Sequence, residues 1–94
     1  VSETNAREKA EGYLNFMAFS RSGLITQLEF EGFSTPDATY GTDSLNVDWN
    51  EQAAKKAAGY LEMMAFSRSG LITQLEFEGF TPAQAAYGVS TTGL

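Results

Sequence analysis

Apolar side chains recur along the chain with the spacing of one face of an α-helix. From Trp49 to residue 64 they follow one another at intervals of four, four, three, one and three, which is a helical period. Asp48 directly precedes this run and Glu51 lies three residues further on. Asp48 is therefore predicted to cap the helix, because its carboxylate can accept from the backbone amide of Glu51. Residues 6–17 carry an equivalent apolar face, with Ser2 or Thr4 as the predicted cap.

A second helix is predicted in each half of the chain, bounded by a serine and a glycine. The serine precedes a short amphipathic stretch and is a typical N-cap residue. The glycine ends that stretch and is followed by phenylalanine, which is the pattern of a left-handed C-terminal cap. These boundary residues are Ser20, Gly32 and Phe33 in the first half, and Ser67, Gly79 and Phe80 in the second.

A short third helix follows in each half. Ser34 or Thr35 before Pro36, and Thr81 before Pro82, supply a cap and a first-turn proline. In both halves a glycine after the last tyrosine marks its predicted end, at Gly41 and Gly88. Strand-like alternation is scarce, which favours an all-α fold.

The two halves are copies of one another. Shifting the sequence by 47 residues matches 26 of 47 positions without a gap, and residues 17–33 reappear unchanged as 64–80. We therefore predict an all-α fold built as a tandem repeat of two three-helix units, residues 1–47 and 48–94. Within each unit the second and third helices form a helix-turn-helix-like arrangement.

Composition argues against catalysis. The chain has 94 residues with neither cysteine nor histidine, so thiol nucleophiles, imidazole bases and the usual zinc ligands are missing. Carboxylates two residues apart on a helix point in divergent directions and cannot converge on one ion or substrate atom. We expect no enzyme activity, no cofactor and no metal.

Charge suggests a basic partner instead. Twelve acidic and six basic side chains leave a net charge of −6, which repels phosphate backbones and attracts basic polypeptides. Each predicted second helix also has arginine in its first turn and glutamate in its last, the reverse of what the helix dipole prefers. Two interpretations follow: a tertiary ion pair, such as Arg21 with a first-helix glutamate, or an acidic partner-binding edge. That edge would consist of Glu29, Glu31, Glu76 and Glu78.

DNA binding is disfavoured by the third helices. A recognition helix needs basic or amide side chains facing bases and phosphates. Residues 34–47 carry two aspartates and no basic residue, and residues 81–94 carry no charged side chain. Phe30 and Phe77 lie off the apolar face of the second helices. They either pack under another helix, contact the other repeat or are exposed as interaction anchors, and we expect burial because the middle helix of a three-helix unit touches both neighbours.

The repeated pattern resembles the Ltp-like family, the host cell surface-exposed lipoproteins with a tandem helix-turn-helix region. The resemblance implies a domain held by a lipid at the outer face of a Gram-positive cell membrane, and superinfection exclusion by blocking the uptake of phage DNA. The residues that carry it are Tyr13, Phe19, Ser20, Gly23, Leu24, Gln27, Leu28, Glu31, Gly32, Phe33, Ala38 and Tyr40, their counterparts 47 residues later, and Asp48 with Trp49 between the copies.

Three functions stay open at this point. The first is phage exclusion by binding a basic segment of a phage tail or DNA-injection component. The second is an envelope module that binds a host protein or cell-wall material, and the third is a helix-turn-helix DNA-binding domain. The sequence has no targeting segment, spanning helix or lipid-bearing cysteine, so it is either a soluble protein or the mature or excised part of a longer one. The resemblance implies the second: the soluble part of a lipoprotein that meets the membrane only through its lipid.

Overall fold

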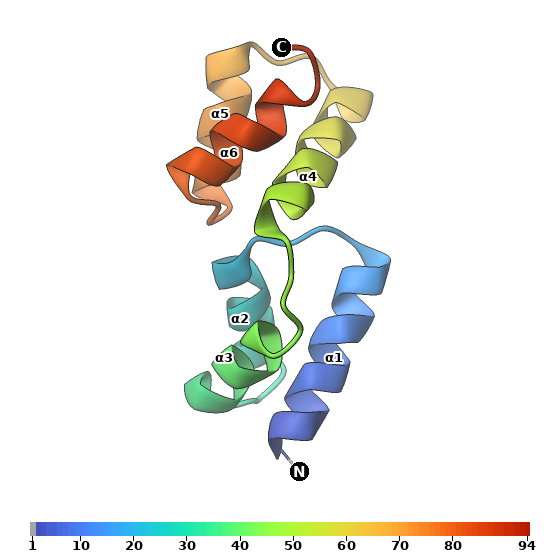
Figure 1. The fold of residues 1–94 in the computed structure, drawn as a ribbon, viewed down its shortest axis with the longest axis vertical. Coiled ribbons are helices and arrows are strands. Elements are labelled where there is room, and N and C mark those ends of the chain that lie inside the picture. The colour runs from blue at the N-terminus through green and yellow to red at the C-terminus, as the bar shows by residue number, and fades with distance from the viewer. Residues whose placement is uncertain (1) are drawn as a thin grey trace. The chain divides into compact units, whose positions relative to one another are not determined.

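The computed structural model describes residues 2–94, and all of their regular structure is helical (Figure 1). The contacts divide the chain into two compact units, one holding the first three helices and the other the last three together with residues 18–20. The predicted all-α architecture of two three-helix repeats is confirmed. The helices are α1 (Ser2–Phe16), α2 (Arg21–Phe30), α3 (Thr35–Asp43), α4 (Trp49–Met63), α5 (Arg68–Phe77) and α6 (Pro82–Ser90).

The core of each unit is small and built around its third helix. In the first unit α3 packs mainly on α1 and less on α2, while α1 and α2 share few contacts. The second unit repeats this pattern with α6 on α4 and α5. Alanines on the first and third helices allow close packing, and leucines of the second helix fill the space beside them. The fully buried apolar residues are Ala6, Ala10, Leu24, Leu28 and Ala38 in one unit, and Ala53, Ala57, Leu71, Leu75, Ala85 and Val89 in the other.

The glycine ends of α2 and α5 have the predicted conformation. Gly32 and Gly79 have φ angles of +102° and +104°, a region that glycine reaches without steric cost. The amide of Phe80 donates to the carbonyl of Leu75 at 3.2 Å, which closes the six-residue loop of a Schellman cap. Phe80 is only 3% exposed and joins the core, whereas Phe33, its counterpart, is half-buried.

Local caps begin several helices as the sequence predicts. The Asp48 carboxylate accepts from the amide of Glu51 at 3.1 Å, and Trp49 follows as the half-buried first residue of α4. The Ser67 hydroxyl accepts from the amide of Gly70 at 3.0 Å and caps α5. Ser20 directly precedes α2, is nearly fully buried, and donates from its hydroxyl to the carbonyl oxygen of Glu78 at 2.6 Å.

The third helices do not end where expected. Gly41 and Gly88 lie inside α3 and α6, which continue to Asp43 and Ser90. Both glycines are buried. A Cβ built on Gly41 would lie 2.7 Å from the carbonyl carbon of Ala6, so these glycines allow the backbones of the first and third helices to touch. The prediction that they mark helix ends was wrong, because their role is a tertiary contact.

Replacement of Thr42 by valine should stabilise the first unit. The Thr42 side chain is fully buried in α3, and its hydroxyl has no hydrogen-bond partner among residues 2–94. A buried unsatisfied polar atom costs about 1–3 kcal/mol. Val89 occupies the equivalent place in α6 and is also fully buried. Thermal unfolding should show Thr42→Val gaining about 1 kcal/mol, whereas a loss would mean that the hydroxyl is satisfied in solution.

Candidate functional site

A cluster of four polar residues joins the first helix of each unit to the second. In the first unit the Tyr13 hydroxyl donates to the Glu31 carboxylate and accepts from the side-chain amide of Gln27 at 3.2 Å. Lys9 lies 3.9 Å from Glu31, and its ammonium group is 5.8 Å from the centroid of the Tyr13 ring. The hydrogen bond to Glu31 is the main cause that raises the pKa of Tyr13.

The second unit repeats this cluster with equivalent residues. Gln74 donates to the Tyr60 hydroxyl at 3.1 Å and to the Glu78 carboxylate at 3.3 Å. Lys56 lies 3.4 Å from Glu78 and 5.9 Å from the centroid of the Tyr60 ring. Because the first and second helices of a unit share few other contacts, this cluster is a principal link between them.

The four glutamates of the predicted acidic edge fall into two kinds. Glu31 and Glu78 face lysines of the first helices, and their side chains are 33% and 23% exposed. Their charge is partly compensated. Glu29 accepts a hydrogen bond from the Thr35 hydroxyl, and Glu76 is exposed. The acidic edge stays a prediction, and its uncompensated charge comes mainly from Glu29 and Glu76.

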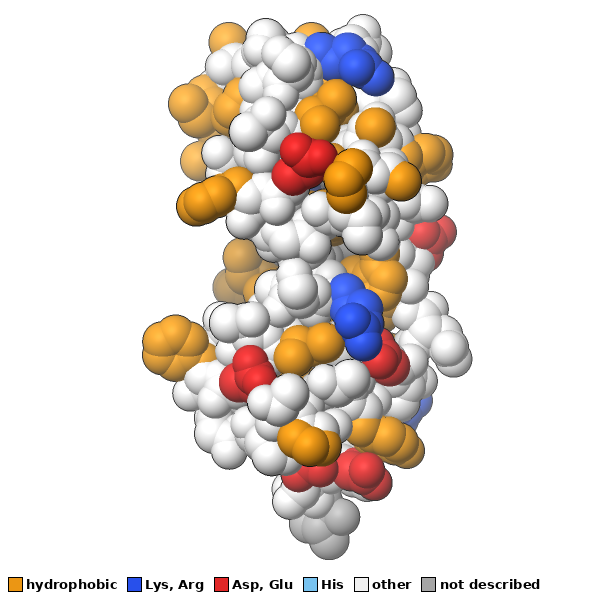
Figure 2. All heavy atoms as spheres, turned by 90° about the vertical axis from the view of Figure 1, so that its left-hand side faces the viewer, with side chains coloured by type: hydrophobic (Ala, Val, Ile, Leu, Met, Phe, Trp, Pro, Cys, Tyr) orange, Lys and Arg blue, Asp and Glu red, His pale blue; other side chains and the backbone are white. Residues whose placement is uncertain are grey.

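Phe30 and Phe77 are exposed, not buried as expected. Each is the last residue of its helix and 86% exposed. Each stands between two glutamates, in the segments 29–31 and 76–78, which we call the Glu–Phe–Glu segments. An exposed ring of this size at the same place in both repeats is typical of an interaction anchor. Figure 2 shows one face on which apolar side chains reach the surface at several separate places.

Arg21 forms a tertiary ion pair, although with a different partner from the one expected. Its guanidinium donates two hydrogen bonds to Asp43 at the end of α3, at 2.7 and 2.8 Å. The expectation of a glutamate on the first helix was wrong. Hydrogen bonds from Arg21 hold the pKa of Asp43 below its usual value of 3.8. The second unit has Arg68 and Ser90 at these places, so it cannot form the same pair.

Loss of this ion pair should cost stability in a pH-dependent way. The Asp43 pKa is lowered in the folded state, so its contribution exists above the unfolded pKa and is lost as pH falls through the folded pKa. Both side chains are about half exposed, so we expect Arg21→Ala to cost about 0.5–1 kcal/mol at pH 7 and almost nothing near pH 2. Urea unfolding at both pH values measures this. Arg68→Ala is the matched control, and an equal loss there would contradict the role of the pair.

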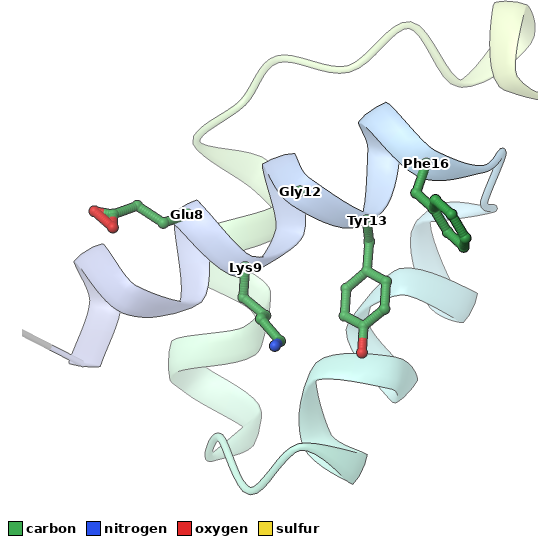
Figure 3. A pocket seen from close by; sticks show the side chains of 5 residues that line it. All are labelled: Glu8, Lys9, Gly12, Tyr13 and Phe16. Atoms are coloured by element: carbon green, nitrogen blue, oxygen red, sulfur yellow. The ribbon is translucent and has the colours of Figure 1, made fainter.

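Each unit has an open pocket on its first helix, at equivalent positions in the repeat. The pocket of the first unit has a volume of about 350 Å³ and is lined by Glu8, Lys9, Gly12, Tyr13 and Phe16. In Figure 3, Lys9 and Tyr13 point the same way from α1 and Glu8 points away from them. The pocket of the second unit measures about 480 Å³, and its lining includes Lys55, Lys56, Gly59, Tyr60 and Met63.

The polar clusters and the pockets were not predicted from the sequence. The spacing of lysine four residues before tyrosine, which both repeats contain, is the one signal that points to them. Residues 2–94 contain no group of three or more acidic residues placed to hold a metal ion. None of their helices is long and apolar enough to cross a membrane.

Comparison with known proteins identifies the class of this tandem-repeat fold. The model of the host cell surface-exposed lipoproteins matches residues 2–45 and again residues 48–91. The chain belongs to this family, and the resemblance read from its sequence is confirmed.

A solved structure gives a more specific relative. It is that of Ltp, a superinfection exclusion protein from the Streptococcus thermophilus temperate phage TP-J34, with a TM-score of 0.87 and 30% sequence identity. The match covers 95% of this chain and 93% of that one. A search of curated protein sequences finds no match.

Proposed function

We propose that this chain gives superinfection exclusion at the outer face of the cell membrane of a Gram-positive host. It binds, without catalysis, a basic segment of a phage tail or DNA-injection component, and so blocks the uptake of phage DNA. Membership in a family of surface-exposed lipoproteins and the similarity to a phage exclusion protein support this role.

The observation that carries the binding mechanism is the pair of Glu–Phe–Glu segments. Each segment presents an aromatic ring that is 86% exposed, with a carboxylate on either side in the sequence. Each also lies at the C-terminal end of its helix, where the helix dipole adds negative potential. A partner with lysine or arginine around an apolar side chain complements this arrangement. Opposite charge raises the rate of encounter, and burial of the ring supplies affinity.

The role is tested with cells that display the domain on their surface. Phage adsorption should be unchanged, while the amount of phage DNA that reaches the cytoplasm should fall. Reduced adsorption would show that the domain blocks a receptor instead. Unchanged DNA uptake would contradict exclusion and favour an envelope module that binds a host protein or cell-wall material.

The electrostatic part is tested with purified components. Affinity for the phage tail or injection proteins should fall as salt is raised, because salt screens exposed charges. An affinity that is independent of salt would contradict binding through the acidic residues. Tight binding to duplex DNA at physiological salt would favour the DNA-binding alternative.

A further inference from the structure

Two glycines, Gly12 and Gly59, lie inside helices at positions where their own unit has room for a side chain. A Cβ built on Gly12 in α1 or on Gly59 in α4 would meet no atom within 4 Å. Glycine is the least favourable helix-interior residue after proline, so alanine would suit both positions better. The glycines discussed above differ: Gly88 touches the backbone of a neighbouring helix, and Gly79 has a positive φ.

Both of these glycines line the open pockets. Gly12 lies in the pocket of the first unit, and Gly59 lies at the equivalent place in the second. The apolar wall beside each glycine is exposed, since Phe16 is 82% and Met63 is 80% accessible. A bare glycine beside an apolar wall lets atoms of another molecule approach the helix backbone closely.

We propose that each pocket receives a bulky apolar side chain from a basic amphipathic helix of the partner. The inference deepens the proposed function and rests on it. The pocket and the Glu–Phe–Glu segment belong to one continuous surface. Tyr13 lines the pocket and accepts a hydrogen bond from Gln27 of α2. Phe30 lies three residues after Gln27, so Gln27 and Phe30 are neighbours on the surface of α2. The acidic residues attract the basic face of the partner helix, and the pocket holds one of its apolar residues.

The two pockets differ in the charge of their lining residues, and this difference predicts which of them binds a basic helix more tightly. Glu8 and Lys9 balance one another in the first pocket, whereas the second is lined by Lys55 and Lys56 with Glu62 as its one acidic residue. Lys55 is paired with Glu51 at 3.3 Å, although both side chains are more than half exposed. A basic helix should therefore occupy the first pocket at a lower concentration than the second.

The test uses a synthetic amphipathic helix of lysine and leucine, about 18 residues or five turns long. It is titrated into the ¹⁵N-labelled chain while backbone amide signals are followed by NMR. We expect the Gly12 signal to shift first and the Gly59 signal next, with no shift at Gly93 near the C-terminus. If the Gly59 signal shifted before the Gly12 signal, the predicted order of affinity of the two pockets would be wrong. If the peptide bound without shifting either signal, the pockets would not be its binding sites.

A double variant separates stability from binding. Gly12→Ala with Gly59→Ala should raise the melting temperature by about 4 °C or more, because alanine favours the helix. It should also weaken peptide binding about tenfold, because each methyl group occupies the approach to the backbone. Asn5→Ala with Asn50→Ala is the control, since both asparagines are exposed on α1 and α4 outside the pocket linings, and it should leave affinity unchanged.

The outcomes distinguish the two proposals. If the unmodified chain does not bind the peptide, the proposed preference for a basic partner is wrong, and so is the proposal that the pockets bind its apolar side chains. If the unmodified chain binds and the glycine double variant binds equally well, only the pocket assignment is wrong.

Discussion

Gly88→Ala is expected to destabilise the second unit strongly and to lower its melting temperature. A Cβ at this position would lie 2.6 Å from the carbonyl carbon of Ala53 and 2.7 Å from its oxygen. These are backbone atoms, so no side-chain rotation relieves the clash, and α6 must move away from α4. Overpacking of this kind costs about 1–3 kcal/mol or more, which is comparable with the whole stability of about 2–7 kcal/mol expected for a 47-residue unit.

Gly59→Ala in the same unit is the matched control, with the opposite expected sign. Its Cβ would meet no atom within 4 Å, so only helix propensity changes, by about 1 kcal/mol in favour of alanine. Circular dichroism during heating measures both variants. If Gly88→Ala melted at the same temperature as the unmodified chain, α4 and α6 would not be in backbone contact in solution.

The helix boundaries that the sequence predicts well depend on neighbouring residues alone. The positive φ of Gly79 follows from a glycine and a phenylalanine at the end of an apolar period, and the cap at Asp48 follows from Glu51 three residues later. The 47-residue repeat strengthens each such signal, because both copies show the same pattern. The fold class and the number of helices therefore follow from local patterns in the chain.

The errors concern contacts between residues that are distant in the chain. Gly88 is mistaken for a helix end because a glycine after tyrosine looks the same whether it ends a helix or touches one. Burial of Phe30 is wrongly expected because the middle helix of a three-helix unit need not contact both neighbours on that side. Arg21 is assigned the wrong acidic partner because charge spacing cannot show that the end of α3 lies beside the start of α2.

The candidate site is only partly predictable for the same reason. The sequence indicates the four glutamates and their repetition, but the lysines that compensate Glu31 and Glu78 lie more than 20 residues away. In the structure, each Glu–Phe–Glu segment presents a phenylalanine ring that is 86% exposed and has a glutamate on either side in the sequence. In the proposed function, charge selects the kind of partner and the aromatic ring contributes the contact energy.

Phe30→Ser with Phe77→Ser should abolish phage exclusion without unfolding the chain. Each ring is 86% exposed, so its removal should change stability by no more than about 0.5 kcal/mol. A buried aromatic anchor at an interface contributes about 2 kcal/mol or more, and its loss weakens binding about 30-fold. Cells that display the double variant should therefore take up phage DNA as readily as cells that lack the domain.

A second exposed aromatic pair provides the control for this experiment. Tyr40 and Tyr87 occupy equivalent places in α3 and α6 and are 48% and 49% exposed. Their replacement by serine removes a ring from each unit that does not belong to the Glu–Phe–Glu segments, and exclusion should persist wherever the melting curve shows a folded chain. If the phenylalanine variant still excluded phage, the Glu–Phe–Glu segments would not be the binding surface. If only the tyrosine variant failed while folded, the partner would bind the third helices instead. Together the two variants test the Glu–Phe–Glu segments separately from the tyrosines of the third helices.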